Sequence, residues 1–162
     1  MAQHNDRRAL TLRDILQARS VAVIGASEDL SKWGGRAFSI LCKHQVSTAI
    51  YPVNPNADTV MGVTAYRSIA DCPTPIDIAM VLVPASAMAQ TVQACAQASV
   101  GCAIIITAGF AEASEAGQEL EQQLLQVARE SGMRIIGPNC IGILNAHRNM
   151  LACTAVALPV ID

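Results

Sequence analysis

The feature that most constrains the fold is an apolar run that ends in a glycine and is followed by a polar loop and a helix start. Residues 20–27 read SVAVIGAS, and residues 32–35 read KWGG. The Val- and Ile-rich run predicts a buried strand that ends at Gly25, and the apolar spacing that follows predicts a helix over residues 34–44. Gly25 permits a sharp turn and a close ligand approach. The helix start directs N–H groups at the same point, so this corner suits a phosphate in a doubly wound α/β fold.

Apolar runs and helical apolar stripes alternate along the rest of the chain. Further strands are predicted over residues 49–53, 76–83, 102–107 and 133–137, and further helices over residues 11–18, 85–99 and 114–132. This alternation predicts parallel strands with right-handed crossovers. The expected fold class is therefore α/β, a Rossmann-like doubly wound, mostly parallel sheet with helices on both faces. Residues 60–65 are predicted to be extended, and residues 150–158 to form a final strand or an extended tail.

The composition predicts a single domain without a basic or membrane-spanning segment. The 162 residues carry a net charge of −2 and only 15% charged residues, so there is no basic excess to hold a nucleic acid. The six cysteines form no Cys-x-x-Cys pair, which favours free thiols in a reducing cytoplasm over disulfides or a metal site. No apolar run reaches the roughly 18 residues of a membrane helix. We expect a cytoplasmic protein with no metal, nucleic-acid or membrane partner.

The polar loop after the first strand offers groups that suit a phosphate. Ser27 and Ser31 can donate hydrogen bonds to phosphate oxygens, and Lys32 supplies a positive charge, with Arg36 as a second candidate. The alternative is that Lys32 and Arg36 are ordinary solvated residues at a helix start. Trp33, the single tryptophan, has two open roles: it either shields a ligand or packs at the start of the helix.

Two features of the sequence disfavour a nicotinamide dinucleotide as the ligand. The dinucleotide fingerprint requires G-x-G-x-x-G, whereas Gly25 is followed by Ala26 and Ser27. Dinucleotide-binding proteins also place an acidic residue at the end of the second strand to bind ribose hydroxyls, whereas Asn54 stands there and Asp58 lies four residues later. The missing carboxylate favours a ligand with a phosphate near its ribose, because a carboxylate would repel that phosphate.

Six short motifs, in order, give the sequence a specific resemblance. They are VAVIGAS ending at Ser27, the pair Gly34-Gly35, YPVNP at residues 51–55, VPA at 83–85, ITAGF at 106–110 and GPNCIG at 137–142. Over residues 12–150 the chain resembles the CoA-binding domain of the NDP-forming acyl-CoA synthetases, relatives of the succinyl-CoA synthetase α subunit. Each motif is weak alone, but the series is specific. The resemblance implies a Rossmann-like fold that binds coenzyme A across the strand ends.

The resemblance also assigns ligand contacts to the loops at the strand ends. It implies a CoA-phosphate loop at Gly25, Ala26, Ser27, Lys32 and Gly35, and a following turn at Asn54 and Pro55. It implies loops along the pantetheine arm at Val83, Pro84, Ala85, Thr107, Ala108 and Gly109, and Asn139 at the thioester end. There the family passes an acyl phosphate to the CoA thiol. The 3′-phosphate of CoA would account for the missing carboxylate after the second strand.

No residue of this chain is expected to be catalytic. The resembling family works through a phosphorylated histidine of a second domain and an ATP-grasp domain, and both are expected to lie outside this chain. None of His4, His44 and His147 is a good candidate for that histidine, and Cys140 is expected to pack rather than to act as a nucleophile. Whether the chain itself is an enzyme stays open, because it is expected to bind CoA without completing a ligase cycle.

The expected organisation has three segments. Residues 1–10 are predicted to be a flexible tail, residues 11–150 the CoA-binding domain, and residues 151–162 a strand or tail leading to an absent second domain. The main hypothesis is the CoA-binding module of an ADP-forming acid–CoA ligase, as a fragment or as a separate subunit. Two alternatives stay open: a CoA- or nucleotide-sensing regulatory domain of a protein acetyltransferase, and a stand-alone bacterial CoA-binding protein.

Overall fold

The structure, a computed structural model that describes residues 10–44, 46–73 and 75–155, is built around one parallel sheet. Its five strands have the order β2-β1-β5-β6-β7. They are β1 (Ser20–Ile24), β2 (Ala49–Val53), β5 (Ile78–Val81), β6 (Cys102–Ile105) and β7 (Arg134–Ile136). The doubly wound α/β fold predicted from the sequence is confirmed. β1 pairs with β2 on one side and with β5 on the other, and both pairs are parallel. The order in which successive strands are added to the sheet therefore reverses between β1 and β5.

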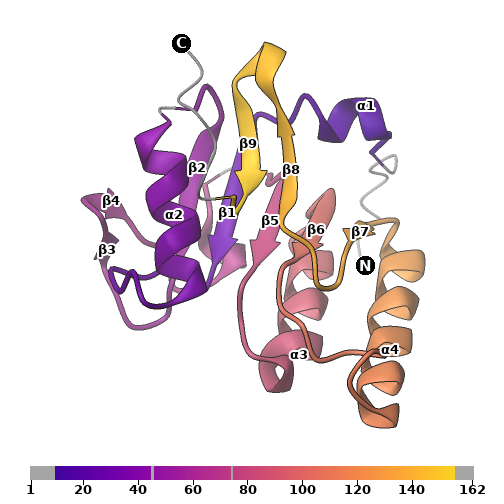
Figure 1. Ribbon diagram of the computed structural model, residues 1–162. Helices are drawn as coiled ribbons and strands as arrows, with labels where there is room; N and C mark the ends of the chain where they lie inside the picture. Colours follow the sequence, from indigo (N-terminus) through magenta and orange to yellow (C-terminus); the bar gives the residue numbers. More distant parts are fainter. Residues whose placement is uncertain (1–9, 45, 74, 156–162) are drawn as a thin grey trace, which may run out of the picture.

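Helices cover both faces of this sheet (Figure 1). α2 (Trp33–Lys43) lies on one face, and α3 (Ala85–Gln97) and α4 (Glu115–Ser131) lie on the other. Val21 and Val23 of β1 belong to the core cluster that contains α2, whereas Ala22 and Ile24 belong to the cluster that contains α3 and α4. Both sides of the strand are therefore buried, which explains its continuous apolar sequence.

An antiparallel hairpin shares the α2 face of the sheet. It consists of β8 (Gly142–Asn145) and β9 (Met150–Cys153), and Figure 1 shows it in yellow beside α2. All four residues of β9 are buried. A strand in this region was one of the two sequence predictions, whereas β8 was not predicted. Residues 156–162, where the alternative tail was expected, lie outside the described residues.

The smaller elements differ from the sequence predictions in length or in type. α1 (Leu12–Ile15) is shorter than the helix predicted over residues 11–18, and it begins with a capping box between Thr11 and Asp14. The predicted extended piece is instead a small hairpin of β3 (Thr59–Val60) and β4 (Val63–Thr64). Two short 3₁₀ helices, η1 (Ile69–Asp71) and η2 (Ala146–Arg148), complete the described elements. The tail predicted for residues 1–10 falls, except for Leu10, outside the described residues.

Candidate functional site

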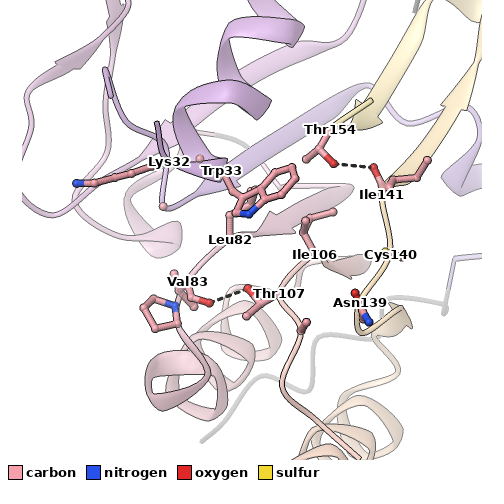
Figure 2. Close-up of a pocket in the computed structure, with 14 residues that line it drawn as sticks. Lys32, Trp33, Leu82, Val83, Ile106, Thr107, Asn139, Cys140, Ile141 and Thr154 are labelled. Atoms are coloured by element: carbon pink, nitrogen blue, oxygen red, sulfur yellow. Dashed lines mark hydrogen bonds between the residues drawn. The ribbon is translucent and has the colours of Figure 1, made fainter. Parts of the chain in front are cut away.

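A cavity of about 610 Å³ lies at the carboxyl ends of the central strands. Its walls come from the start of α2, from the loops after β1, β5, β6 and β7, and from Thr154 after β9 (Figure 2). The lining residues are Gly25, Lys32, Trp33, Gly34, Leu82, Val83, Pro84, Ile106, Thr107, Ala108, Asn139, Cys140, Ile141 and Thr154. Doubly wound folds bind ligands at this edge of the sheet, beside the point where the strand order reverses. The volume is in the range of small-molecule sites.

The corner between β1 and α2 is built on direct backbone contact. Gly25 has a φ of +92°, a conformation that favours glycine. A Cβ atom added to Gly34 would lie 1.8 Å from the carbonyl oxygen of Gly25, so only glycine allows α2 to begin this close to the strand. Lys32 precedes the helix, and among the described residues no side chain caps it. The first N–H groups of α2 therefore lie at the cavity wall, where a phosphate would be stabilised.

The loop over residues 27–32 is organised around the carboxylate of Asp29. Ser31 donates to this carboxylate from its backbone N (2.9 Å) and its Oγ (2.6 Å), and Lys32 Nζ lies 3.8 Å away. The Ser31 hydrogen bonds, with the smaller effect of Lys32, hold the pKa of Asp29 below its ordinary value. Asp29 N in turn donates to Ser27 Oγ at 3.0 Å. Ser27, Ser31 and Lys32, which were predicted to bind phosphate, thus each contact Asp29 within the loop.

Arg36 supports the same loop from α2. Its Nε donates to the carbonyl oxygen of Leu30 at 2.8 Å, and its Nη2 donates to that of Ser31 at 3.3 Å. The guanidinium carbon also lies 5.4 Å from the ring centroid of Trp33. Arg36 does not line the cavity. Its contacts indicate that it positions the loop and the indole rather than binding a phosphate directly.

Three strand-end loops, over residues 82–84, 106–108 and 139–141, form the opposite side of the cavity. Thr107 Oγ1 donates to the carbonyl oxygen of Val83 at 2.8 Å, and Asn139 N donates to that of Thr107 at 3.1 Å. Cys140 Sγ is half-buried and donates to the carbonyl oxygen of Ile105 at 3.5 Å. The first two bonds join the loops after β5, β6 and β7 directly to one another, and Figure 2 draws the bond between Thr107 and Val83.

The structure divides the predicted ligand residues into two groups. Gly25, Lys32, Val83, Pro84, Thr107, Ala108 and Asn139 line the cavity, whereas Ala26, Ser27, Gly35, Asn54, Pro55, Ala85 and Gly109 do not. Ala26 is fully buried, and a Cβ atom on Gly35 would lie 2.1 Å from the carbonyl oxygen of Asp29. Asn54 Nδ2 donates to the carbonyl oxygen of Ala26 at 2.8 Å. These three residues shape the corner, and the ligand contacts of both groups stay predictions.

Several lining residues were not among the sequence predictions. Leu82 and Thr154 line the cavity without having been considered as site residues, and Ile106 and Ile141 belong to the quoted motifs but were given no ligand contact. Trp33, Gly34 and Cys140 were discussed but not selected. Leu82 and Ile106 follow β5 and β6 directly, so the rule that ligands bind at strand ends could have identified them. Thr154 carries no such signal, because its position depends on the β8–β9 hairpin.

Comparison with known proteins identifies the family. The CoA binding domain family matches residues 19–146. The chain belongs to this family of CoA-binding domains. Over 134 residues it is 44% identical to the α subunit of the ADP-forming acetate–CoA ligase II of Pyrococcus furiosus, covering 83% of this chain and 29% of that protein. This CoA-binding domain therefore spans less than a third of that relative.

Solved structures agree with this assignment. A protein of Pyrococcus horikoshii OT3 is 41% identical, with a TM-score of 0.84, over 89% of this domain and 33% of that chain. The dinucleotide-forming acetyl-coenzyme A synthetase 1 of Candidatus Korarchaeum cryptofilum, solved with phosphate and ADP, is 35% identical. Its TM-score is also 0.84, over 89% of this domain and 31% of that chain. The domain is thus homologous to parts of longer proteins, which include an ADP-forming acetate–CoA ligase subunit and an acetyl-coenzyme A synthetase.

The described residues include all six cysteines, and each is a free thiol. Burial raises the pKa of Cys95 and of Cys102 to about 12 and that of Cys72 to about 11, so these thiols are neutral near pH 7. Within residues 10–44, 46–73 and 75–155, no group of three His, Cys, Asp or Glu side chains is placed to hold a metal ion. Nor does any described helix combine the length and apolar character needed to cross a bilayer.

Proposed function

We propose that this domain holds CoA across the cavity at the strand ends and presents its thiol to an acyl phosphate, as part of an ADP-forming acid–CoA ligase. The domain's membership of the CoA-binding family supports the ligand, and the names of its relatives support the ligase reaction. The observation that carries the proposal is the cavity itself, which runs from an uncapped helix start to Asn139. A long ligand with phosphates at one end requires such a series of loops.

The proposed orientation of CoA follows the chemistry of the two sides. Its phosphates lie at the start of α2, near Lys32 and Ser27, in the corner shaped by Gly25, Ala26, Gly35, Asn54 and Pro55. Its pantetheine arm runs past Val83, Pro84 and Ala85 and past Thr107, Ala108 and Gly109, where backbone groups can bind its amides. Its thiol lies near Asn139. Lys32 and the N–H groups at the start of α2 contact the phosphates of CoA, and the apolar walls of the cavity contact its pantetheine arm.

The chemistry proposed for this site is thioester formation. The CoA sulfur attacks the carbonyl carbon of the acyl phosphate and a C–S bond forms. The C–O bond to the phosphate breaks, and inorganic phosphate leaves with the thiol proton. This domain binds and orients the thiol, and its own residues carry no covalent step. The acyl phosphate is made when the terminal phosphoryl group of ATP passes through the histidine to the acid and ADP is released, and this step needs the histidine and the ATP-grasp domain, which are the proposed partners.

The proposal also includes a domain organisation and a cellular compartment. Residues 11–150 act as the CoA-binding domain, and the residues after them lead toward the partner domains. The proposed compartment is the cytoplasm. Six free thiols suit a reducing compartment of that kind.

Calorimetric titration of the chain with CoA, 3′-dephospho-CoA and NAD tests this function. CoA should bind more tightly than 3′-dephospho-CoA, and NAD should give no binding heat. Lys32→Ala should weaken CoA binding about tenfold, because it removes a phosphate contact. Lys43→Ala is the matched control, since it removes the same charge at the far end of α2. Tighter binding of NAD, or no binding of CoA to the wild type, would refute the proposal.

A further inference from the structure

Trp33 occupies an unusual place in the cavity. It is the only aromatic residue among the described residues that line it. It is the first residue of α2, and 58% of its surface is exposed. Figure 2 shows its indole projecting from the helix start across the middle of the cavity, between Leu82 and Thr154. A large apolar ring therefore projects into the cavity while more than half of its surface stays exposed.

The contacts of Trp33 do not indicate a packing role. Among the described residues it belongs to neither of the two core clusters. Its ring is instead held by the guanidinium of Arg36, 5.4 Å from the ring centroid, and Arg36 is fixed by its bonds to Leu30 and Ser31. The ring is thus positioned while much of its surface stays open. An aromatic side chain held in this way offers a preorganised apolar contact to a ligand.

The position of the ring within the cavity selects one part of CoA. Lys32 extends from the same helix start in the opposite direction in Figure 2, so the charged end of the ligand lies on that side of the indole. Asn139, proposed to meet the thiol, lies on the other side. The residues near the ring include Leu82 and Ile106, which are apolar. Between the phosphates and the thiol, CoA carries the pantetheine arm with its two methyl groups.

We propose that Trp33 packs its indole against the pantetheine arm of CoA, and that it selects ligands with this arm over other adenine nucleotides. The inference rests on the proposed function, because it takes CoA as the occupant of the cavity. The sequence left two roles open for Trp33, shielding a ligand or packing at the start of the helix. The inference assigns the first of these roles to Trp33. Arg36 is then a positioning residue that acts through the indole.

Fluorescence provides a direct test, because Trp33 is the single tryptophan of the chain and all indole emission reports on it. The chain is titrated to saturation with CoA, with 4′-phosphopantetheine and with adenosine 3′,5′-bisphosphate. CoA and 4′-phosphopantetheine should change the intensity or the wavelength of the emission. Adenosine 3′,5′-bisphosphate should compete with CoA in calorimetry and leave the emission unchanged.

Variants separate this contact from general effects on the fold. Trp33→Ala should lower the affinity for CoA by about tenfold, as expected for truncation of a central aromatic contact, and Trp33→Phe should keep most of it. Neither variant should alter the affinity for adenosine 3′,5′-bisphosphate. Leu12→Ala is the matched control, because Leu12 is also a large exposed apolar residue, at 67%, but lies in α1 and does not line the cavity. It should bind CoA like the wild type.

The outcomes distinguish this inference from the function on which it rests. If wild-type chain binds CoA but Trp33→Ala binds it equally well, the contact does not exist and the proposed function stands. If adenosine 3′,5′-bisphosphate changes the emission as CoA does, Trp33 meets the nucleotide end and the pantetheine assignment is wrong. If wild-type chain gives no binding heat with CoA, the proposed function itself fails.

Discussion

The two sides of the cavity are held together in opposite ways. In the 27–32 loop the hydrogen bonds around Asp29 join near neighbours in sequence, and Asp29, Ser31 and Lys32 are all exposed. One long-range bond, donated by Met61 N to Glu28 Oε1, ties this loop to the turn between β3 and β4. In the strand-end loops the bonds join residues far apart in sequence, such as Thr107 to Val83, and their side chains are partly buried. Both sides use ordinary hydrogen bonds. The bonds around Asp29 stay within one loop, whereas the bonds on the second side tie the loops after separate strands to one another.

This difference suggests different behaviour toward a ligand. Exposed ion pairs and hydrogen bonds contribute little to stability, so the 27–32 loop can exchange them for bonds to phosphate oxygens at small cost. The strand-end loops are fixed by the sheet and by each other, so they present a preformed wall. The cavity therefore combines an adaptable side for the charged end of CoA with a rigid side for its arm and thiol.

The largest effect is expected where the two sides meet, at Gly34. In Gly34→Ala the new Cβ would lie 1.8 Å from the Gly25 carbonyl oxygen, so α2 must move away from β1. The free energy of unfolding should fall by at least about 2 kcal/mol, as in other overpacked sites, and CoA binding should be lost. Urea denaturation and calorimetry measure both effects.

Gly62→Ala is the control for this substitution. Gly62 has a φ of +77° but open space around its Cβ position. The Gly62→Ala substitution should lower the free energy of unfolding by about 1 kcal/mol through backbone strain. The variant should keep the wild-type affinity for CoA. A Gly34→Ala chain as stable as the wild type would contradict the described β1–α2 contact.

A smaller effect is expected on the rigid side from Thr107→Val. This change keeps the shape of the side chain but removes the donor to the Val83 carbonyl oxygen. The free energy of unfolding should fall by about 1 kcal/mol, and CoA affinity should fall because the loops after β5 and β6 are no longer joined. Thr91→Val removes an equivalent bond within α3, from Oγ1 to the Ala87 carbonyl oxygen at 2.8 Å. If both variants weaken CoA binding equally, the loop connection does not matter for the ligand.

On the adaptable side, Asp29→Asn should change binding more than stability. The amide oxygen can still accept from Ser31, but the negative charge beside Lys32 and the phosphates is removed. CoA affinity should rise about twofold to threefold at low salt and return toward the wild-type value at high salt. Calorimetry at two ionic strengths measures this. Weaker binding at low salt would show that the charged carboxylate is needed to order the loop.

The smallest effect concerns the pH dependence of stability. The pKa of Asp29 is lowered in the folded chain, so its carboxylate stabilises the fold at pH values above its ordinary pKa of 3.8. That contribution is lost as the pH falls through the lowered folded pKa. The small difference in stability between wild type and Asp29→Asn should therefore be constant from neutral pH down to the region of 3.8 and shrink below it. A difference that changes between pH 7 and pH 5 would contradict this assignment.

The sequence predicted the parts of the molecule that depend on local pattern. The strand ending at Gly25 and the helix ending at Gly132 were placed within one or two residues, because turn and capping signals are local. The strand β8 was missed, since Gly142–Asn145 has no clean alternation and pairs only once β9 folds back. Thr154 was missing from the predicted site for the same reason, because its position also depends on the pairing of β8 with β9. The polar groups of the 27–32 loop were predicted as candidates, but their bonds to Asp29 could not be read from spacing.

Hydrogen exchange of the chain with and without saturating CoA tests the central claim most directly, because it locates the ligand on the fold. The account predicts the largest slowing of exchange over residues 27–36, where exposed contacts are replaced by ligand contacts, and a smaller slowing over the strand-end loops. Protection confined to the groove lined by Leu12, Leu125 and Ile136, or no change in the 27–36 segment, would contradict it.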